Sequence, residues 1–461
     1  MQREFFGTDG IRGPVGQGKM NPQWVMALAW SIGRSLTQSQ PSRPTVLLGQ
    51  DTRASGPMFT AALQAGFNAA GVDVFLAGVL PTPAIAYLSR SLSLSAGLAI
   101  TASHNPHQDN GLKLFMDGQK LSDAQELAIE AQMRLALSQG WQAVPSAQLG
   151  RVARLEDARG RYIEFCKSFW PSDLSLKGLR LVVDCAHGAA SGLAERVLRE
   201  LGAEVMAPFS EPNGANINFH CGATAPQALQ TQVIQQQADL GLAFDGDADR
   251  LLMVSSTGQI LDGDHLLYLL VQASLAQGQQ VPGVVGTLMT NMGLQARLQQ
   301  LGIELVRAPV GDRYVKQELL RLGWQLGGEN SGHLLNLAKV QTGDAIIAAL
   351  CILQHLQRSG QSLAEASNSL QLWPQVLINL PWQQAQVQDC PDLQEAVNDV
   401  EQALAGRGRL LLRKSGTEPL LRVMVEAECE QLAKRLAKQL ADQLRAWQQQ
   451  LERPEQTKVE S

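Results

Sequence analysis

Three aspartates stand at alternate positions in a short loop between two apolar runs. They are Asp245, Asp247 and Asp249, within DGDADR at 245–250. Carboxylates this close repel one another, and a hard divalent cation relieves the repulsion; ligation by oxygen alone favours Mg²⁺ over zinc. A calcium-binding EF-hand is excluded because its sixth position must be glycine and is Arg250 here, whereas a plain acidic turn stays open. We expect a Mg²⁺ site in which Arg250 can also neutralise charge on a phosphate.

A candidate nucleophile and a candidate proton carrier lie earlier in the chain. Ser103 stands in the loop TASHNP at 101–106, directly after an apolar run. No G-x-S-x-G pattern surrounds it, so the loop is not the nucleophile elbow of a hydrolase; alone, the serine fits a helix cap or a turn equally well. Lys113 lies among apolar residues, which would lower the pKa of its ammonium group and let it carry a proton. The alternative for Lys113 is a surface lysine.

Three further loops have compositions that suit a phosphorylated sugar. Glu329 and Ser331 lie between glycines in GGENSGH at 327–333 and can bind sugar hydroxyls, although a turn after a helix is the alternative. Another loop gathers cations, hydroxyls and a glycine, which fits a dianionic phosphate or a basic hairpin rim. Its residues include Arg413, Lys414, Ser415, Gly416 and Thr417, with Arg422 nearby. Arg12, in the glycine-rich GTDGIRG at 7–13, gives a weaker phosphate signal.

Three of these loops recur at equivalent positions of a repeated strand and helix pattern. Each repeat opens on an apolar strand, passes through a helix that ends at glycine, and reaches a later strand that leads into a polar loop. The expected first strands cover 45–49, 179–183 and 283–288, and the later strands cover 96–100, 240–244 and 323–326. Strands alternating with helices form parallel α/β units, which bind ligands beyond the carboxyl ends of their strands. We therefore expect three similar α/β repeats.

The region from about 371 has a different order and predicts a smaller α+β unit. Strands are expected at 376–380, 409–412 and 420–426, and helices at 392–405 and 428–451. The cationic loop at 413–419 joins two of these strands.

Composition limits the classes of partner. The 461 residues carry a formal net charge of −5, which argues against nucleic acid as the main partner. No run of about 18 apolar residues is present, so we expect no membrane span, and the N-terminus lacks the apolar core of a signal peptide. The six cysteines show no zinc-binding spacing and suggest reduced thiols. These features predict a cytoplasmic protein.

Taken in order, the motifs GTDGIRG, TASHNP with DNGLK, DGDADR, GGENSGH and RKSGTEP span nearly the whole chain. Together they resemble the α-D-phosphohexomutase superfamily, and specifically its bacterial glucosamine-phosphate branch. The resemblance implies an α/β fold with four domains around a central cleft: three similar α/β repeats with mixed sheets and a smaller C-terminal α+β domain. We place the domains at 1–150, 151–255, 256–370 and 371–461.

The resemblance also implies a role for each motif residue. Ser103 would carry a phosphate, and that phosphate would bind one Mg²⁺ together with Asp245, Asp247 and Asp249. The residues around the transferred group would be Arg12, His104, Lys113 and Arg250, with Lys113 a candidate acid or base. Glu329 and Ser331 would contact sugar hydroxyls, and the substrate's other phosphate would be held by Arg413, Ser415, Gly416, Thr417 and Arg422.

The implied reaction interconverts glucosamine 6-phosphate and glucosamine 1-phosphate through a bound 1,6-bisphosphate, supplying UDP-N-acetylglucosamine and cell-wall precursors. A hexosamine phosphate would be the small-molecule partner of a monomer or homodimer. Two departures from the branch are Ala248, where glycine is frequent, and the pair Phe219 and His220, where charged residues are usual. The alternatives are phosphoglucomutase or phosphomannomutase activity, a Mg²⁺-dependent sugar-phosphate phosphatase, and a non-catalytic sugar-phosphate sensor.

Overall fold

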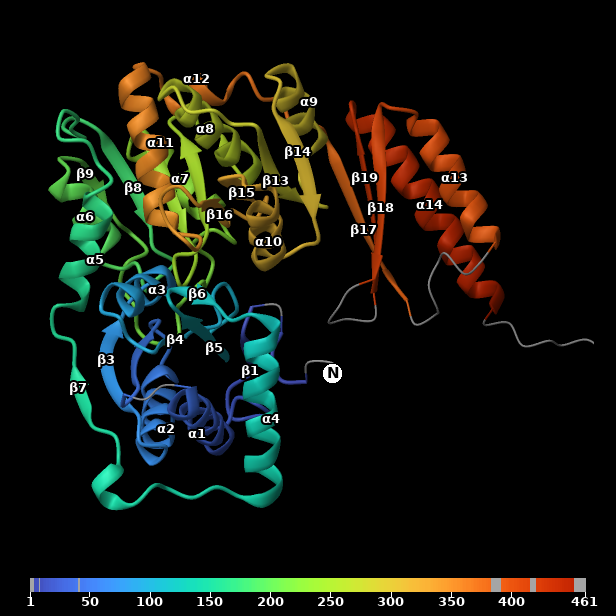
Figure 1. Cartoon of the computed structure of the whole chain (residues 1–461). Coiled ribbons are helices and arrows are strands. Elements are labelled where there is room, and N and C mark those ends of the chain that lie inside the picture. The colour runs from blue at the N-terminus through green and yellow to red at the C-terminus, as the bar shows by residue number, and fades with distance from the viewer. Residues whose placement is uncertain (1–3, 8, 40–41, 383–390, 415–419, 452–461) are drawn as a thin grey trace, which may run out of the picture. The chain divides into compact units, whose positions relative to one another are not determined.

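The computed structural model describes residues 4–7, 9–39, 42–382, 391–414 and 420–451 (Figure 1). The chain divides into two compact units. The first consists of Met1–Thr290 with Leu298–Ser369, and the second of Asn291–Arg297 with Leu370–Ser461.

The first sheet of the first unit leads into the loop that contains Ser103. Over the described residues its strand order is β1-β5-β4-β2-β3-β7, with β6 paired to β5. Strands β2, β3 and β4 are parallel, and β5 runs antiparallel to β4, so the sheet is mixed. Its elements are β1 (Ile11–Pro14), α1 (Pro22–Ser39), β2 (Thr45–Gln50), α2 (Gly56–Ala69), β3 (Asp73–Val79), α3 (Thr82–Ser91), β4 (Ala96–Ile100), β5 (Asp109–Met116), β6 (Gln119–Lys120), α4 (Asp123–Gln139), the 3₁₀ turn η1 (Ser146–Gln148) and β7 (Val152–Arg154).

Helices α1 and α2 pack against each other in this part of the fold because small residues line their contact. A Cβ atom on Gly66 would lie 2.2 Å from the carbonyl oxygen of Met26. Apolar side chains such as Phe59 and Phe67 are fully buried in the adjoining core. Since burial of apolar surface is the main stabilising term, this core gives the Ser103 loop a rigid base.

The second sheet carries the aspartate loop. Its order over the described residues is β12-β11-β10-β8-β9, in which β8, β9 and β10 are parallel and β11 turns back against β10. Its elements are α5 (Ala158–Lys167), β8 (Arg180–Asp184), α6 (Ala194–Glu200), β9 (Glu204–Met206), α7 (Gln227–Gln235), β10 (Leu240–Phe244), β11 (Leu251–Ser255), β12 (Ile260–Leu261) and α8 (Gly263–Ala276).

The third sheet repeats the plan, with the order β14-β13-β15-β16 over the described residues. Strands β13, β14 and β15 are parallel, and β16 is antiparallel to β15. The elements of this region are β13 (Gly283–Thr287), α9 (Met292–Gln300), β14 (Glu304–Ala308), α10 (Asp312–Leu322), β15 (Leu326–Gly328), β16 (Leu334–Asn336), α11 (Ala345–Ser359) and α12 (Leu363–Ser367).

The three mixed sheets confirm the predicted α/β repeats. In each, a parallel strand runs into a polar loop and the chain returns as an antiparallel strand: β4 to β5, β10 to β11, and β15 to β16. One strand prediction was wrong. The strand expected at 323–326 lies at Leu326–Gly328, because Gly323 adopts φ +70° and ends helix α10 in the left-handed conformation.

The second unit has the predicted α+β composition. Over its described residues a three-stranded antiparallel sheet has the order β17-β19-β18, and helix α14 packs against β17 and β19. In its core the rings of Trp382 and Trp447 stack with centroids 5.8 Å apart. The elements are β17 (Gln375–Pro381), α13 (Pro391–Leu404), β18 (Gly408–Lys414), β19 (Leu420–Ala427) and α14 (Glu430–Leu451).

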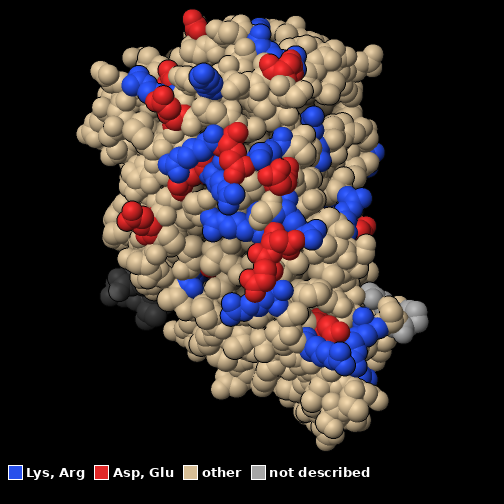
Figure 2. All heavy atoms as spheres, turned by 90° about the vertical axis from the view of Figure 1, so that its left-hand side faces the viewer, with Lys and Arg blue, Asp and Glu red and all other residues tan. Residues whose placement is uncertain are grey.

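Domain boundaries stay a prediction. Strand β7 joins the first sheet although it follows the expected boundary at 150, and β12 joins the second sheet although it follows 255. Among the described residues, no helix combines the length and apolar character that crossing a bilayer requires. Figure 2 shows basic and acidic side chains interspersed over one face, and paired surface charges include Lys167 with Glu200.

Candidate active site

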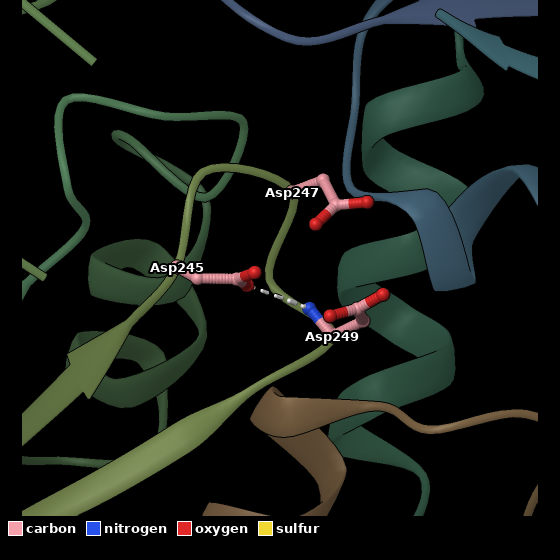
Figure 3. A group of neighbouring side chains, drawn as sticks. All are labelled: Asp245, Asp247 and Asp249. Atoms are coloured by element: carbon pink, nitrogen blue, oxygen red, sulfur yellow. Dashed lines mark hydrogen bonds between the residues drawn. The ribbon is translucent and has the colours of Figure 1, made fainter. Parts of the chain in front are cut away.

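The aspartate loop brings its three carboxylates together in the protein interior (Figure 3). Phe244 and Leu251 pair across β10 and β11, so the six residues between them must form a tight turn. One oxygen from each of Asp245, Asp247 and Asp249 lies within 4.8 Å of the others, and all three residues are buried. This spacing and the oxygen-only donor set suit a hard divalent cation.

The electrostatics of the loop fit such a cation. Burial, reinforced by repulsion from Asp249 and Asp247, raises the pKa of Asp245 to about 8. The Oδ1 atoms of Asp247 and Asp249 are buried and have no hydrogen-bond partner among the described residues. Unsatisfied buried carboxylate oxygens are costly, and a bound Mg²⁺ would satisfy both. The chain therefore presents the donors that the predicted Mg²⁺ requires.

Ser103 lies against the aspartate loop, although the two are 142 residues apart in sequence. It follows β4, and its Oγ donates a hydrogen bond of 2.5 Å to Oδ2 of Asp245. The residue is 1% exposed. The structure thus places the predicted nucleophile beside the predicted metal ligands.

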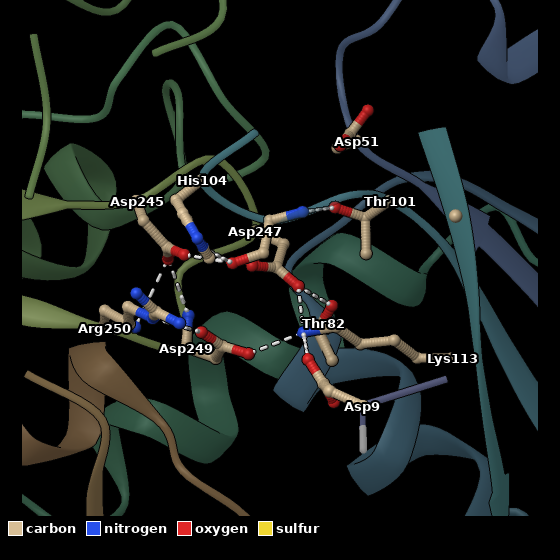
Figure 4. Close-up of polar contacts among 12 residues, drawn as sticks. Asp9, Asp51, Thr82, Thr101, His104, Lys113, Asp245, Asp247, Asp249 and Arg250 are labelled. Carbon is tan, nitrogen blue, oxygen red and sulfur yellow. Dashed lines mark hydrogen bonds and ion pairs between the residues drawn. The ribbon is translucent and has the colours of Figure 1, made fainter. Parts of the chain in front are cut away.

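His104 also faces this site (Figure 4). Its Nδ1 lies 3.2 Å from the Oγ of Ser103. Burial, together with the charges of Arg250 and Arg12, lowers the pKa of His104 to about 4. A neutral imidazole is therefore expected beside the serine hydroxyl, where it can share that proton.

Arg12 and Arg250 bring positive charge to the same place. Arg12 forms an ion pair with Asp9, and Nε of Arg250 lies 4.0 Å from Oδ1 of Asp249. The Nε atoms of both guanidinium groups are buried and lack a hydrogen-bond partner among the described residues. Both groups can therefore still donate to an anion, as a transferred phosphate requires.

Lys113 lies in the site, but its pKa is shifted in the opposite direction from the one predicted. Its Nζ lies 2.8 Å from Asp247, 2.6 Å from Asp249 and 3.2 Å from Asp9 (Figure 4). Burial alone would lower the pKa of Lys113, but these carboxylates outweigh it and hold that pKa well above its usual value. The predicted lowering was wrong because side chains alternate along β5, so the apolar sequence neighbours do not surround the ammonium group.

Four polar residues without an assigned role in the sequence complete a ring of charges. Lys120 contacts Asp9 and Asp312, and His333 lies 3.4 Å from Asp312 and 3.6 Å from Asp249. Burial lowers the pKa of His333, but Asp312 and Asp249 outweigh it and raise that pKa to about 9. GTDGIRG and GGENSGH contain Asp9 and His333, and those motifs were the available signal.

The predicted sugar loop is tied to the end of the aspartate loop. The amide of Leu251 donates to the carbonyl of Gly332, and the side chain of Glu329 accepts from the amide of Gly311 at 3.0 Å. Burial raises the pKa of Glu329. Ser331 is half-buried in the same turn. The loop therefore lies beside the charged cluster, where a sugar hydroxyl can be bound.

The predicted phosphate-binding loop belongs to the second unit. Arg413 on β18 and Arg422 on β19 pair directly across the sheet. Like charges directly opposite each other disfavour a sheet. Ser415, Gly416 and Thr417 lie outside the described residues.

Comparison with known proteins identifies the architecture. Four family profiles, described as phosphoglucomutase/phosphomannomutase domains I, II, III and C-terminal, match residues 3–139, 160–258, 262–372 and 377–443 in order. The chain belongs to the phosphoglucomutase/phosphomannomutase family. All four domains of the family are present.

Curated relatives in this family cover almost the entire chain. A protein of Burkholderia lata named phosphoglucosamine mutase is 53% identical over 452 residues, covering 97% of this chain and 99% of the relative. One of the same name from Cupriavidus taiwanensis is 54% identical over 451 residues, covering 97% and 100%. These identities are well above the 24% and 17% of solved structures that share the fold.

Solved structures of the family share the fold. A phosphoglucomutase/phosphomannomutase family protein from Burkholderia thailandensis matches with a TM-score of 0.78 and 24% identity, covering 96% of this chain and 97% of that one. An Aspergillus fumigatus N-acetylphosphoglucosamine mutase, solved with GlcNAc-6P and magnesium, matches with a TM-score of 0.65 and 17% identity, covering 96% of each chain.

Proposed function

We propose that this chain is a phosphoglucosamine mutase, an isomerase that interconverts glucosamine 6-phosphate and glucosamine 1-phosphate. The observation that carries the proposal is the 2.5 Å hydrogen bond from Ser103 Oγ to Asp245, within a buried three-carboxylate cluster. The names of relatives at 53% and 54% identity support the choice of amino sugar. We further propose that the protein works in the cytoplasm, as a monomer or homodimer.

Asp245, Asp247 and Asp249 are the residues that would hold Mg²⁺, together with a phosphate on Ser103. When bound, the ion supplies charge neutralisation at the phosphate. The deprotonated state of Asp245 that ligation needs is then favoured over the neutral state that burial favours in its absence.

The remaining steps of phosphoryl transfer are carried out by side chains of the protein. The phosphate on Ser103 passes to the 1-hydroxyl of glucosamine 6-phosphate: the P–Oγ bond breaks, a P–O bond to the sugar forms, and the hydroxyl proton ends on Oγ. Arg12 and Arg250 can bind the moving phosphoryl group through their Nε atoms, which have no hydrogen-bond partner among the described residues. Lys113, held protonated by three carboxylates, keeps a positive charge beside Asp247 and Asp249.

The second half of the reaction needs two separate anion sites. The 1,6-bisphosphate must turn over so that its 6-phosphate returns to Ser103. One phosphate then lies at Ser103 while the other is held by Arg413, Ser415, Gly416, Thr417 and Arg422. Glu329 and Ser331 would bind the sugar hydroxyls in both orientations.

The decisive test is whether phosphate resides on Ser103 and moves to substrate. Peptide mapping of the purified protein should find one added phosphate, about 80 Da, on the peptide that contains Ser103. Ser103→Ala should retain binding of glucosamine 6-phosphate and lose about 10³-fold or more in kcat. Normal isomerisation by Ser103→Ala would sink the proposal.

The alternatives give different products. Comparing kcat/KM for glucosamine, glucose and mannose 6-phosphates separates this activity from phosphoglucomutase and phosphomannomutase. Steady release of inorganic phosphate without isomerised sugar would identify a phosphatase, and binding without turnover would identify a sensor.

A further inference from the structure

The backbone of Ser103 is held in an unfavourable conformation. Its φ is +52°, in the left-handed region that costs a residue with a side chain roughly 1–2 kcal/mol. Such a conformation persists only where the surroundings enforce it, and it then fixes where the side chain points. The amide of Ser103 donates to Oγ1 of Thr101 at 2.9 Å, which restrains one side of the residue.

On its other side, the carbonyl oxygen of Ser103 accepts hydrogen bonds from two side chains in separate loops, one after β2 and one after β9. Nη2 of Arg53 donates to this oxygen at 3.0 Å, and Nδ2 of Asn218 donates to it at 2.9 Å. The same two groups also donate to the carbonyl of Asn105, at 2.8 and 3.1 Å. We call Arg53 and Asn218 the Ser103 clamp.

Arg53 is committed entirely to this loop. Its side chain is 0% exposed, and its Nε pairs with Asp51 at 2.9 Å. Nη1 donates to the carbonyls of Pro106 and Asp109, so one guanidinium holds four carbonyl groups between residues 103 and 109. All five N–H groups have acceptors, and Arg53 is therefore not available to bind a substrate phosphate.

The backbone of Asn218 is held by a hydrogen bond. Gly246 of the aspartate loop lies close to both the Asn218 side chain and the Ser103 carbonyl. Asn218 has φ +58°, a conformation that asparagine tolerates better than most residues. Its backbone N–H donates to the carbonyl of Ala186 at 2.9 Å. A Cβ atom on Gly246 would lie 2.5 Å from the Ser103 carbonyl oxygen and 3.0 Å from Nδ2 of Asn218. The clamp thus closes the Ser103 carbonyl against the loop that carries the aspartates.

We propose that Arg53 and Asn218 are positioning residues for phosphoryl transfer. By holding the Ser103 carbonyl they keep its backbone left-handed, so that Oγ stays directed at Asp245 and not at solvent. The inference rests on the proposed function, since it concerns transfer from Ser103. It predicts loss of the transfer rate without equal loss of substrate affinity, because the side-chain donors of both residues are used on the backbone of the Ser103 loop.

The sharpest test is Asn218→Gly, because glycine can keep the left-handed backbone while the side-chain amide is removed. We expect the single-turnover rate from ³²P-labelled enzyme to glucosamine 6-phosphate to fall about 10- to 100-fold. The KM should stay within about threefold of wild type. The matched control is His220→Gly, in the same loop at φ +54° with an exposed side chain, which should transfer at the wild-type rate.

Rates are expressed per labelled enzyme, so a merely structural loss that inactivates part of the sample does not change them. Transfer by Asn218→Gly at the wild-type rate overturns the clamp. A wild-type enzyme that never passes its label to glucosamine 6-phosphate overturns the proposed function instead.

Arg53→Lys gives a second measurement. Lysine can still pair with Asp51 but cannot hold four carbonyls at once, so a loss larger than that of Asn218→Gly is expected. If this variant does not fold, Asn218→Gly alone decides.

Discussion

The ammonium group of Lys113 lies among three carboxylates of the candidate site. It balances Asp9, Asp247 and Asp249 in the protein interior, and two of these are the proposed ligands of a cation. Removing one partner of a buried ion pair typically costs about 3–5 kcal/mol, because the remaining charge is left uncompensated. Lys113 therefore contributes to the integrity of the site as well as to any proton transfer.

This balance predicts how metal and lysine compensate for each other. In Lys113→Met the metal-free protein should lose about 3 kcal/mol of stability, and Mg²⁺ should restore part of it by taking over the neutralisation. Thermal unfolding with and without MgCl₂ measures this: the metal should raise the Tm of Lys113→Met more than that of wild type. The control is Lys339→Met, a lysine beside Phe169, which should respond to Mg²⁺ like wild type. Equal responses of all three proteins would contradict the balance.

Residue 246 must be glycine because a side chain there would collide with the carbonyl oxygen of Ser103. The Cβ of Gly246→Ala would press on the Ser103 carbonyl at 2.5 Å, and that carbonyl cannot move without releasing the clamp. We expect kcat to fall about 10-fold or more, as for other small displacements of reacting groups. Gly160→Ala is the matched control: among the described residues nothing lies within 4 Å of its Cβ, and alanine inside helix α5 should stabilise the protein by about 0.5–1 kcal/mol. Wild-type kcat in Gly246→Ala would refute the argument.

At the scale of elements, helix α11 begins with a titratable cap. Oδ1 of Asp344 accepts from the amide of Ile347 at 3.0 Å, and its Oδ2 accepts from the hydroxyl of Tyr162 at 2.7 Å. Burial raises the pKa of Asp344 to about 6, against about 3.9 for an exposed aspartate. The folded state therefore holds this proton more tightly than the unfolded state does. Stability from the group is complete below about pH 4 and is lost as the pH rises through about 6.

Asp344→Asn removes the titration and keeps the cap, since the amide oxygen can still accept from Ile347. Denaturant unfolding at about pH 4 and about pH 7 should show wild type losing roughly 2–3 kcal/mol relative to the variant across this interval. A difference that does not change with pH would disprove the assignment.

The sequence predicted the order of elements better than their contacts. Glycines and apolar runs locate most strands because they act locally, and the strand at 323–326 was misplaced only where Gly323 still belonged to a helix end. Nothing local reveals that Lys113 faces carboxylates from another sheet, nor that Arg53 holds carbonyls about 50 residues later in the chain. Such contacts depend on which loops face one another, and that follows from the assembled sheets.

At the scale of the whole first unit, the charged ring joins loops from all three sheets. Asp9 and Lys120 belong to the first sheet's segment, Asp249 to the second, and Asp312 and His333 to the third. Several of these charges are balanced across sheets: Lys120 pairs with Asp312, and His333 lies near Asp249. The site is therefore a product of the packing of the three repeats, and no single repeat contains it.

The pair Lys120 and Asp312 tests this coupling because the two residues are 192 positions apart and mostly buried. A double-mutant cycle of Lys120→Met and Asp312→Leu, read by denaturant unfolding, should give a favourable coupling of about 1–3 kcal/mol. The matched cycle uses Arg90 and Asp117, whose side chains are 56% and 80% exposed and 3.8 Å apart, and should give less than about 0.5 kcal/mol. If the buried pair proves additive, the ring is a local arrangement of charges and does not hold the repeats together. If it couples as expected, then the charges that surround the transferred phosphate also help to fix the repeats that deliver it.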